Sequence, residues 1–474
     1  MRTQAAKAAR HDIELALRPG DHVHFVGIGG IGLSAIARIL LQRGYAVSGS
    51  DLTLSGITED LVQLGASVHH GHQRENIGPA NLMVASSAIP TDNPEIVGAQ
   101  ERNIPVIRRG QILAWLMKDR RGIAIAGTHG KTTTTAMIGL VLEEAGLDPV
   151  IVVGGIVPEL GTNAKDGSGV YFVLEADEYD RTFLELWPEI AVITSIEMDH
   201  PDCYADLNDM AEAFQRFLSQ LPADGCVVAY EGDSQVKKVV QLLDQRRVLT
   251  YGLGKDAGWR ALSLRQNTLG GSDFQVIVDG DDKGEFKLGI PGVHNVSNAL
   301  AAIAVTDYLG LDLGSVRETL RHFQGVKRRF EVKGEVNGIT VIDDYAHHPS
   351  EIRATLAGAR ERYPGRKIWV VFQPHTYSRT RALLPEFAAA FDDADRVIVT
   401  AIYAAREANS LGISADDLVR NMSHPWVEHI PNRSEVGSWV RDQLEPRDVL
   451  ITMGAGDVWR VGEDVLALLQ QSGK

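Results

Sequence analysis

The stretch Ile123-Ala-Ile-Ala-Gly-Thr-His-Gly-Lys-Thr-Thr-Thr-Thr135 decides the expected fold of the middle of the chain. Its apolar beginning predicts a buried strand, and the glycines that follow predict a tight loop. Residues 132–145 then predict a helix that stops at Gly146. A strand, a glycine loop and a helix in this order form a cradle in which backbone N–H groups and the helix N-terminus face an anion.

Two side chains add chemistry to this cradle. Lys131 supplies a positive point charge, and the hydroxyl of Thr132 can ligate Mg²⁺. The pattern departs from G-x-x-x-x-G-K-[ST] at its first position, where Ile125 replaces glycine. The alternative is a strand-to-helix turn that merely contains glycines, but this alternative does not explain the lysine and the run of threonines. The stretch therefore predicts a phosphate-binding loop.

A second glycine-rich turn lies near the start of the chain. The run His22–Gly27 predicts a strand that enters Gly27-Ile-Gly-Gly-Ile-Gly32, and a helix and a further strand ending near Asp51 follow. This is the G-x-G-x-x-G fingerprint in its βαβ setting, which binds a diphosphate and leaves open what is attached to it. The strand at 82–87 ends in Ser86 and Ser87, which we expect in the same pocket.

Acidic residues follow a strand beside the phosphate loop. The run Tyr171–Leu174 predicts a buried strand that delivers Glu175, and an acidic residue at this place usually holds Mg²⁺. The next strand, at 190–194, leads to His200, a candidate second-metal ligand. Residues 248–290 predict an antiparallel patch. Asn295 and Asn298 are three residues apart, so they share a face of the first turn of the following helix.

The last third of the chain predicts another Rossmann-like sheet. Strand and helix patterns alternate at 368–372, 396–401 and 448–453, after a hairpin-like stretch. His375 and Arg379 follow the strand at 368–372, and sites in open parallel sheets gather at such carboxyl ends.

The fold class is therefore α/β, with three predicted domains. These are an N-terminal Rossmann-like domain, a central phosphate-loop domain whose mostly parallel sheet carries a small antiparallel patch, and a C-terminal Rossmann-like domain. We place their boundaries at residues 1–118, 119–324 and 325–474.

Composition excludes several classes of protein. The net charge of −15 and the lack of a basic run argue against a nucleic-acid partner. Cys203 and Cys226 lack metal-ligand spacing and suit a reducing compartment. The leader at 1–17 lacks the apolar core of a signal peptide, and no apolar run reaches membrane length. We expect a cytoplasmic protein without membrane insertion; the sequence does not predict its oligomeric state.

Taken together, the motifs resemble the Mur ligases of peptidoglycan synthesis over nearly the whole chain. Those that carry the resemblance, in the family's order, are GIGGIG, GTHGKTTTT, EADEYD, the Asp-His of IEMDH, GVHNVSNA, Arg-Arg-Phe at 328–330, DDYAHHP and QPHTYSRT. The family's own loop pattern is GTxGKT, so Ile125 is no departure within it. GIGGIG and QPHTYSRT look like the alanine-adding branch. The resemblance implies a UDP-sugar domain, a central ATPase and a domain for the amino acid.

The resemblance also implies roles for individual residues. It implies Mg²⁺ ligation by Thr132, Glu175 and His200, and an amino-acid pocket with His348, His375 and Arg379. UDP-sugar contacts would come from Gly29, Gly30, Ile31, Gly32, Asp51, Ser86 and Ser87. ATP contacts would come from Gly127, Thr128, His129, Gly130, Lys131, Thr132, Thr133, Asn295, Asn298, Arg329 and Asp344. Among all these, the residues with catalytic roles would be Lys131, His200, Arg329, Asp344 and His348.

The function implied is an ATP-driven ligation of L-alanine to the carboxylate of UDP-N-acetylmuramate through an acyl phosphate. His348 or His375 would take the amine proton, and the sequence does not choose between them. Three alternatives remain. One is the recycling ligase that joins a preformed tripeptide to the same UDP-sugar. Another is a nicotinamide-dependent oxidoreductase, suggested by the first fingerprint alone. The third is a nucleotide-gated binding protein without catalysis.

Overall fold

The computed structural model describes residues 15–243 and 246–472. Residues 1–14 lie outside this range. They make up most of the leader from which the sequence analysis expects no signal peptide. The chain divides into two compact units. The first takes in the chain up to Glu197 with Leu207–Trp259 and Leu300–Thr319, and the second takes in Met198–Asp206, Arg260–Ala299 and the chain from Leu320 onward.

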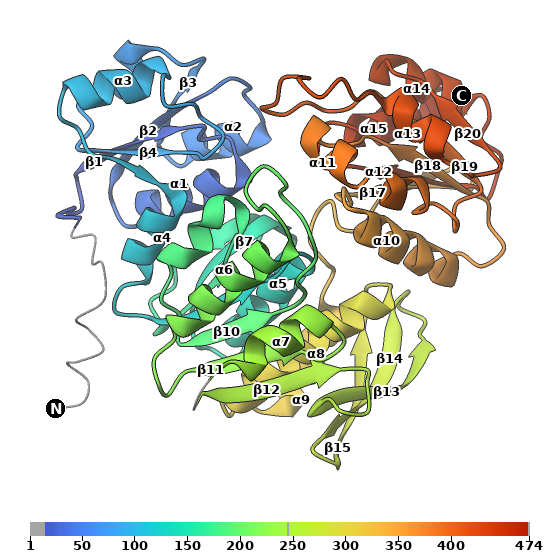
Figure 1. The fold of residues 1–474 in the computed structure, drawn as a ribbon, viewed down its shortest axis with the longest axis horizontal. Coiled ribbons are helices and arrows are strands. Elements are labelled where there is room, and N and C mark those ends of the chain that lie inside the picture. Colours follow the sequence, from blue (N-terminus) through green and yellow to red (C-terminus); the bar gives the residue numbers. More distant parts are fainter. Residues whose placement is uncertain (1–14, 244–245, 473–474) are drawn as a thin grey trace. The chain divides into compact units, whose positions relative to one another are not determined.

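The first sheet of unit 1 is parallel, with the strand order β3-β2-β1-β4-β5. Figure 1 labels its strands β1 to β4. Its strands are β1 (His22–Val26), β2 (Ala46–Asp51), β3 (Ser67–His70), β4 (Leu82–Ala85) and β5 (Val106–Arg108). Its helices are α1 (Ile31–Gln42), α2 (Gly56–Gln63), α3 (Pro94–Glu101) and α4 (Arg109–Met117). The order reverses between β1 and β4, so the loop after β1 lies at the switch point where ligands bind in such sheets.

A second sheet in unit 1 contains the phosphate loop. Its strands run in the order β12-β11-β10-β6-β9-β7-β8. Their bounds are β6 (Arg121–Ala126), β7 (Val150–Val157), β8 (Thr162–Lys165), β9 (Tyr171–Glu175), β10 (Ile190–Ile193), β11 (Cys226–Tyr230) and β12 (Arg247–Gly252). The helices are α5 (Lys131–Glu144), α6 (Leu207–Ser219) and α7 (Ser234–Gln241). β12 pairs with β11 in parallel, so the first strand of the segment predicted to be antiparallel, 248–290, also borders the parallel part of the sheet.

The antiparallel patch itself is confirmed in unit 2. β14 (Ser272–Val278) and β15 (Asp281–Leu288) form an antiparallel hairpin with a bulge after Val276, and β13 (Trp259–Gln266) lies next to β14 in the sheet. The helices α8 (Val293–Tyr308) and α9 (Leu313–His322) follow.

The third sheet has the order β16-β17-β21-β18-β19-β20 and is parallel except for β16 against β17. Its strands are β16 (Glu331–Val336), β17 (Ile339–Asp344), β18 (Ile368–Phe372), β19 (Arg396–Val399), β20 (Val427–His429) and β21 (Val449–Met453). Its helices are α10 (Pro349–Arg362), α11 (Tyr377–Ala382), α12 (Leu384–Ala388), α13 (Ala415–Asn421), α14 (Arg433–Arg441) and α15 (Trp459–Ser472).

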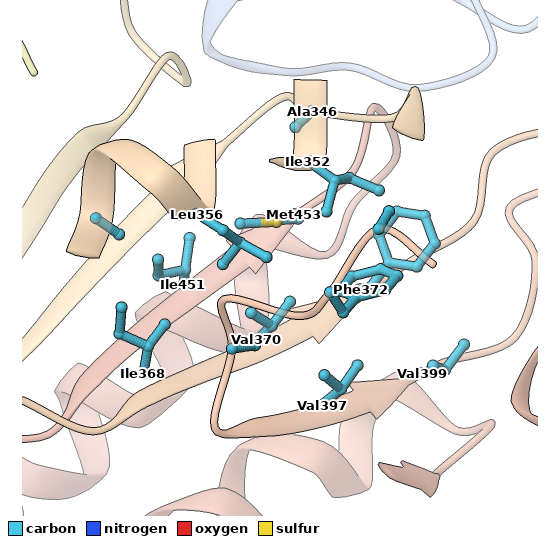
Figure 2. Close-up of a cluster of buried hydrophobic side chains, with 14 of the residues drawn as sticks. Ala346, Ile352, Leu356, Ile368, Val370, Phe372, Val397, Val399, Ile451 and Met453 are labelled. Atoms are coloured by element: carbon cyan, nitrogen blue, oxygen red, sulfur yellow. The ribbon is translucent and has the colours of Figure 1, made fainter. Parts of the chain in front are cut away.

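One core of this third sheet lies beneath α10. Figure 2 shows Ile352 and Leu356 of α10 beside the apolar side chains of β18, β19 and β21. These strands read as continuous apolar runs because a parallel sheet buries both faces. The packing holds the carboxyl ends of the strands in a fixed register, and that edge carries the polar residues described below.

Candidate functional site

Two glycines set the backbone of the phosphate loop between β6 and α5. Gly127 has φ +134°, and a Cβ atom there would lie 2.1 Å from the Thr194 hydroxyl oxygen. Gly130 has φ +80° and caps α5 in the left-handed conformation. A side chain would be strained at both positions, so both glycines are required by the backbone. The predicted strand, loop and helix are confirmed.

The ammonium group of Lys131 lies at the centre of the loop. Its Nζ donates to the carbonyl oxygen of Thr128 at 3.2 Å, to that of Gly127, and to Glu178 at 2.9 Å. Burial alone would lower the pKa of Lys131, but the charges of Glu178 and Asp177 outweigh it and raise the pKa. The lysine is therefore a fixed positive charge beside the N-terminus of α5.

Glu175 ends β9 next to the loop, as the sequence predicted. Its carboxylate accepts hydrogen bonds from Gly154 N and from the side chain of Thr132. Burial raises the pKa of Glu175, against the opposing effects of Gly154, Lys131 and Arg109. A buried carboxylate beside a hydroxyl is the hard oxygen donor set that Mg²⁺ prefers, so these two residues fit the expected metal.

The other loop residues hold the loop against the strand end of β10. Thr128 N donates to Ser195 O at 3.0 Å, and His129 N donates to the Ser195 hydroxyl at 3.0 Å. The Thr128 hydroxyl lies between the Glu197 backbone N and O, at 2.9 and 3.1 Å. Thr133 is buried in the first turn of α5.

The glycine loop after β1 is bound to the end of β2. Gly27 N and Ile28 N donate to Ser50 O at 2.8 and 3.1 Å, and Gly29 N donates to Asp51 Oδ2 at 2.9 Å. Asp51 therefore lies beside the loop, where the fingerprint predicts an acidic residue.

The remaining residues of this loop lie around the N-terminus of α1. Gly30 is the N-cap of α1, and Ile31 is its first residue. A Cβ atom on Gly32 would lie 2.8 Å from Arg109 Nε, so the glycine admits that guanidinium. Ser86 and Ser87 follow β4, and a Cβ atom on Gly27 would lie 3.2 Å from that of Ser86. The residues predicted to contact the UDP-sugar thus lie together at one edge of the first sheet.

Unit 2 brings Arg379 and His375 together. Arg379 Nε donates to Asp199 Oδ1 at 2.8 Å, both side chains being buried, and Arg379 NH1 lies 3.2 Å from His375 Nδ1. Burial would raise the pKa of Asp199, but the charge of Arg379 holds it well below the usual range. Burial and neighbouring positive charges lower the pKa of His375 to about 2. His375 is therefore neutral, with Nδ1 accepting from Arg379.

The other histidines of unit 2 have different surroundings. His348 caps α10: its Nδ1 accepts from Ser350 N at 3.3 Å, and Nε2 lies 3.3 Å from Met198 O. A neutral ring in this position carries its proton on Nε2. His200 has φ +54°, and its Nε2 lies 3.6 Å from Asp199 Oδ2.

Asp344 and Arg329 lie at the carboxyl end of β17. Asp344 accepts hydrogen bonds from Phe330 N and Ala346 N, each at 2.7 Å. Burial raises the pKa of Asp344 to about 6, with Arg329 acting in the opposite direction. The guanidinium of Arg329 lies 5.0 Å from the centre of the Tyr345 ring.

Asn295 and Asn298 are buried in the first turn of α8 and contact each other. Asn298 Nδ2 donates to Asn295 Oδ1 at 3.1 Å, and Asn295 Nδ2 donates to Pro291 O at 2.7 Å. Local hydrogen bonding thus engages one donor of each amide, and each amide keeps a further hydrogen for a ligand.

Sequence reasoning missed several polar residues of these clusters: Glu178, Asp199, His347 and Arg109. Glu178 and Asp199 stand within the motifs already quoted, beside residues to which a role was given. His347 precedes the selected His348, and its ring lies 5.9 Å from that of His375 in edge contact. Arg109 carried no signal, because only the fold brings it to Gly32 and Asp177.

The fold and these clusters define a class of α/β protein. Along the chain, a sheet that carries a phosphate loop follows one Rossmann-like sheet and precedes another. Three family models match in chain order. They describe the Mur ligase family catalytic domain at residues 22–121, the Mur ligase middle domain at 125–306, and the Mur ligase glutamate ligase domain at 328–456.

Curated relatives and solved structures agree with these models. A UDP-N-acetylmuramate–L-alanine ligase of Salinibacter ruber is 46% identical over 455 residues, 95% of each chain. One of Desulfosudis oleivorans is 45% identical over 94% of this chain and 98% of its own. The structure of a UDP-N-acetylmuramate–alanine ligase of Thermotoga maritima superposes with a TM-score of 0.82 at 32% identity, covering 95% of this chain and 99% of that one. The chain belongs to the Mur ligase family.

In the part of the chain that the structure describes, no helix has both the length and the apolar character that crossing a membrane requires.

Proposed function

We propose that the protein joins L-alanine to the carboxylate of UDP-N-acetylmuramate, using ATP and Mg²⁺, as a step of peptidoglycan precursor synthesis in the cytoplasm. The observation that carries the proposal is the cluster of Lys131, Thr132 and Glu175 around a phosphate loop. It occurs in a chain about 46% identical, along nearly its whole length, to a ligase with that name.

The three predicted domains divide the substrates among them. Residues 1–118 would bind the UDP-sugar on the glycine loop, 119–324 would bind ATP, and 325–474 would bind the amino acid. The matches of three family models in this order support the division.

The chemistry must overcome the repulsion between a carboxylate and ATP. A carboxylate oxygen of the sugar attacks the γ-phosphorus, ADP leaves, and the product is an acyl phosphate. The alanine amine then attacks the carbonyl carbon, phosphate leaves and the amine loses a proton. Mg²⁺, when bound, supplies positive charge to the phosphate oxygens. Lys131 binds the same oxygens, and one fixed charge of this kind contributes about 3 kcal/mol.

The residues of the two metal positions have distinct tasks. Thr132 and Glu175 would hold the first Mg²⁺ through hard oxygen donors, and His200 would contribute an imidazole nitrogen to the second. By resemblance to the family, Arg329 and Asp344 would contact ATP, and Asn295 and Asn298 would contact it through their amides. The buried amide pair and the burial of Asp344 support built contacts of this kind.

The amino-acid pocket is assigned to His348, His375 and Arg379. A guanidinium suits the carboxylate of alanine because it can donate two parallel hydrogen bonds. Asp199 accepts from Arg379 Nε and His375 Nδ1 accepts from NH1, so the remaining guanidinium hydrogens, chiefly those of NH2, would meet the alanine carboxylate. Neither histidine offers a free accepting Nδ1, because Ser350 N occupies that of His348 and Arg379 occupies that of His375.

An assay of phosphate release tests the proposal. The protein is supplied with ATP, Mg²⁺, UDP-N-acetylmuramate and one amino acid at a time, and L-alanine should give the highest kcat/KM. Release with the tripeptide but not with L-alanine would replace the proposal with the recycling ligase. Tight NADH binding that competes with the UDP-sugar would favour the oxidoreductase.

A further inference from the structure

A buried carboxylate lies behind the glycine loop of the first sheet. Glu95, in the first turn of α3, is completely buried. Its Oε2 accepts from the Ser50 hydroxyl at 2.6 Å and lies 3.2 Å from His24 Nε2. Its Oε1 accepts from Gln73 N at 3.0 Å and from Asn76 Nδ2 at 2.7 Å. Burial would raise the pKa of Glu95, but these hydrogen bonds outweigh it and lower the pKa, so the group is an ionised acceptor.

The carboxylate fixes the direction of the next hydrogen bond. An ionised carboxylate only accepts, so the single hydroxyl hydrogen of Ser50 points to Glu95. The Ser50 oxygen must then accept from its other neighbour, His72 Nδ1, at 2.8 Å. When the His72 ring is neutral, its hydrogen is therefore on Nδ1, and Nε2 is an acceptor.

That acceptor has no hydrogen-bond partner among the described residues. His72 Nε2 is shielded from solvent and makes no hydrogen bond, and the side chain is 9% exposed. A buried acceptor without a donor costs free energy, and such groups call for an explanation. A ligand that brings an N–H or O–H group would satisfy it.

His72 lies at the ligand-binding edge of the sheet. It follows β3, and the preceding Gly71 N donates to Asp51 O at 2.8 Å. The same turn of β2 binds the glycine loop through Ser50 O and Asp51 Oδ2. His72 therefore lies beside the end of β2 that binds the glycine loop.

We propose that His72 Nε2 accepts a hydrogen bond from the uridine half of the UDP-sugar, either from the imide N–H of the base or from the ribose 2′-hydroxyl. Glu95 and Ser50 are positioning residues that set the His72 tautomer through the hydrogen-bond chain. This inference rests on the proposed function, because it needs a uridine diphosphate on this loop.

Calorimetric titration with UDP tests the contact. In His72→Asn the amide can still donate to Ser50, but no atom reaches the position of Nε2. We expect UDP affinity to fall about tenfold, the size of one hydrogen bond near 1.4 kcal/mol. His70→Asn is the matched control, because His70 is an exposed histidine of β3, and it should bind UDP like the wild type. Equal affinities in all three proteins would overturn the inference.

Nitrogen NMR of the His72 ring tests the chain of hydrogen bonds. The wild type should show the Nδ1–H tautomer. In Glu95→Gln the side-chain amide can donate to Ser50, so the Ser50 hydroxyl can turn to His72, and the Nε2–H tautomer should gain population. An Nε2–H ring in the wild type would contradict the assignment, and a loss of stability alone would not produce the tautomer change.

Two analogues identify the uridine donor. UDP methylated at the imide nitrogen should lose the contact if the base supplies it, and 2′-deoxy-UDP should lose it if the ribose 2′-hydroxyl does. Whichever analogue loses affinity for the wild type should bind His72→Asn no more weakly than UDP does, because the variant lacks the contact. If both analogues bind wild type like UDP, this inference fails while the ligase proposal stands. If the wild type binds no UDP at all, the proposed function itself fails.

Discussion

Unit 1 contains the same backbone arrangement, a strand followed by a glycine loop and a helix, at two places. β1 leads through a glycine loop into α1, and β6 leads through another into α5; each loop begins with a glycine at positive φ, Gly27 at +86° and Gly127 at +134°. The charges differ. Lys131 and Thr132 open the helix after the second loop, whereas that after the first opens with Ile31 and Gly32. This backbone arrangement can bind an anion, and we propose that the side chains decide whether the anion is only bound or also reacts.

The buried glutamates behind the two loops sharpen this contrast. Glu95 has donors from His24, Ser50, Gln73 and Asn76, and its pKa is lowered. Glu175 is buried with fewer donors, and its pKa is raised. Glu95 is a satisfied structural charge, whereas Glu175 is a carboxylate whose charge a cation would stabilise.

Removal of the charge from the phosphate loop should have the largest effect. We expect Lys131→Ala to lower kcat roughly 150-fold, the equivalent of about 3 kcal/mol, if Lys131 is the fixed donor to the reacting phosphate. The affinity for the UDP-sugar should stay within about twofold of wild type, because we propose that this ligand binds at the other loop. Single-turnover phosphate release and calorimetry measure the two quantities.

Lys287→Ala is the control for charge alone, because Lys287 is exposed on β15. It should leave both quantities unchanged. A large loss of UDP-sugar affinity in Lys131→Ala would erase the distinction between the two loops.

A change in unit 2 should leave both loops intact. We expect Arg379→Ala to raise KM for L-alanine roughly thirtyfold, about 2 kcal/mol for the lost charged hydrogen bonds. Binding of ATP and of the UDP-sugar should not change. Loss of Arg379 also leaves Asp199 buried and unpaired, which destabilises the fold, so Arg379→Lys and a melting curve accompany the kinetics. Equal increases in KM for alanine and ATP would place Arg379 on the phosphates.

The reverse of the lysine experiment is a substitution in the first loop. A Cβ atom on Gly29 would lie 2.9 Å from Asp51 Oδ2, so Gly29→Ala should displace the carboxylate that holds the loop. We expect UDP-sugar affinity to fall about tenfold, for the loss of one or two hydrogen bonds. ATP affinity should not change.

Gly56→Ala is the matched control, because a Cβ atom there meets nothing within 4 Å. Both variants are titrated with each nucleotide by calorimetry. Weaker ATP binding in Gly29→Ala would show that the loops do not act separately.

Local sequence patterns predicted both loops and their strands because the signals lie within short windows. An apolar run, a glycine and a helical period occur together around 123–145 and around 22–43, and the structure confirms both. The parallel pairing of β12 was not predicted, because a short alternating strand carries no mark of its partner's direction.

Contacts between distant residues could not be predicted from such windows. Arg379 and Asp199 are 180 residues apart, and Ser50 and Glu95 are 45 apart. The types of the residues in each site were visible, but their hydrogen-bond partners, and so their protonation, depend on tertiary packing.

The smallest expected effect tests the contrast between the glutamates directly. The folded-state pKa of Glu175 is raised, so the folded protein binds more protons than the unfolded chain in the range just above pH 4.5. This contribution to stability is present below the unfolded pKa and is lost as pH rises through the folded pKa. Glu175→Gln removes that loss, so in the absence of metal the variant should be more stable than wild type at pH 8, by about 1 kcal/mol. The difference should vanish near pH 4.

Mg²⁺ should reverse the order of stability. A cation bound by Glu175 stabilises only the folded protein, so Mg²⁺ should raise the melting temperature of the wild type and leave that of Glu175→Gln nearly unchanged. Glu95→Gln is the control, because its pKa is lowered and its charge is already satisfied. That variant should lose stability at pH 8 and keep the response to Mg²⁺. If Glu175→Gln loses stability at pH 8 as Glu95→Gln does, both carboxylates are stabilising structural charges. The proposed difference between the two loops would then be wrong.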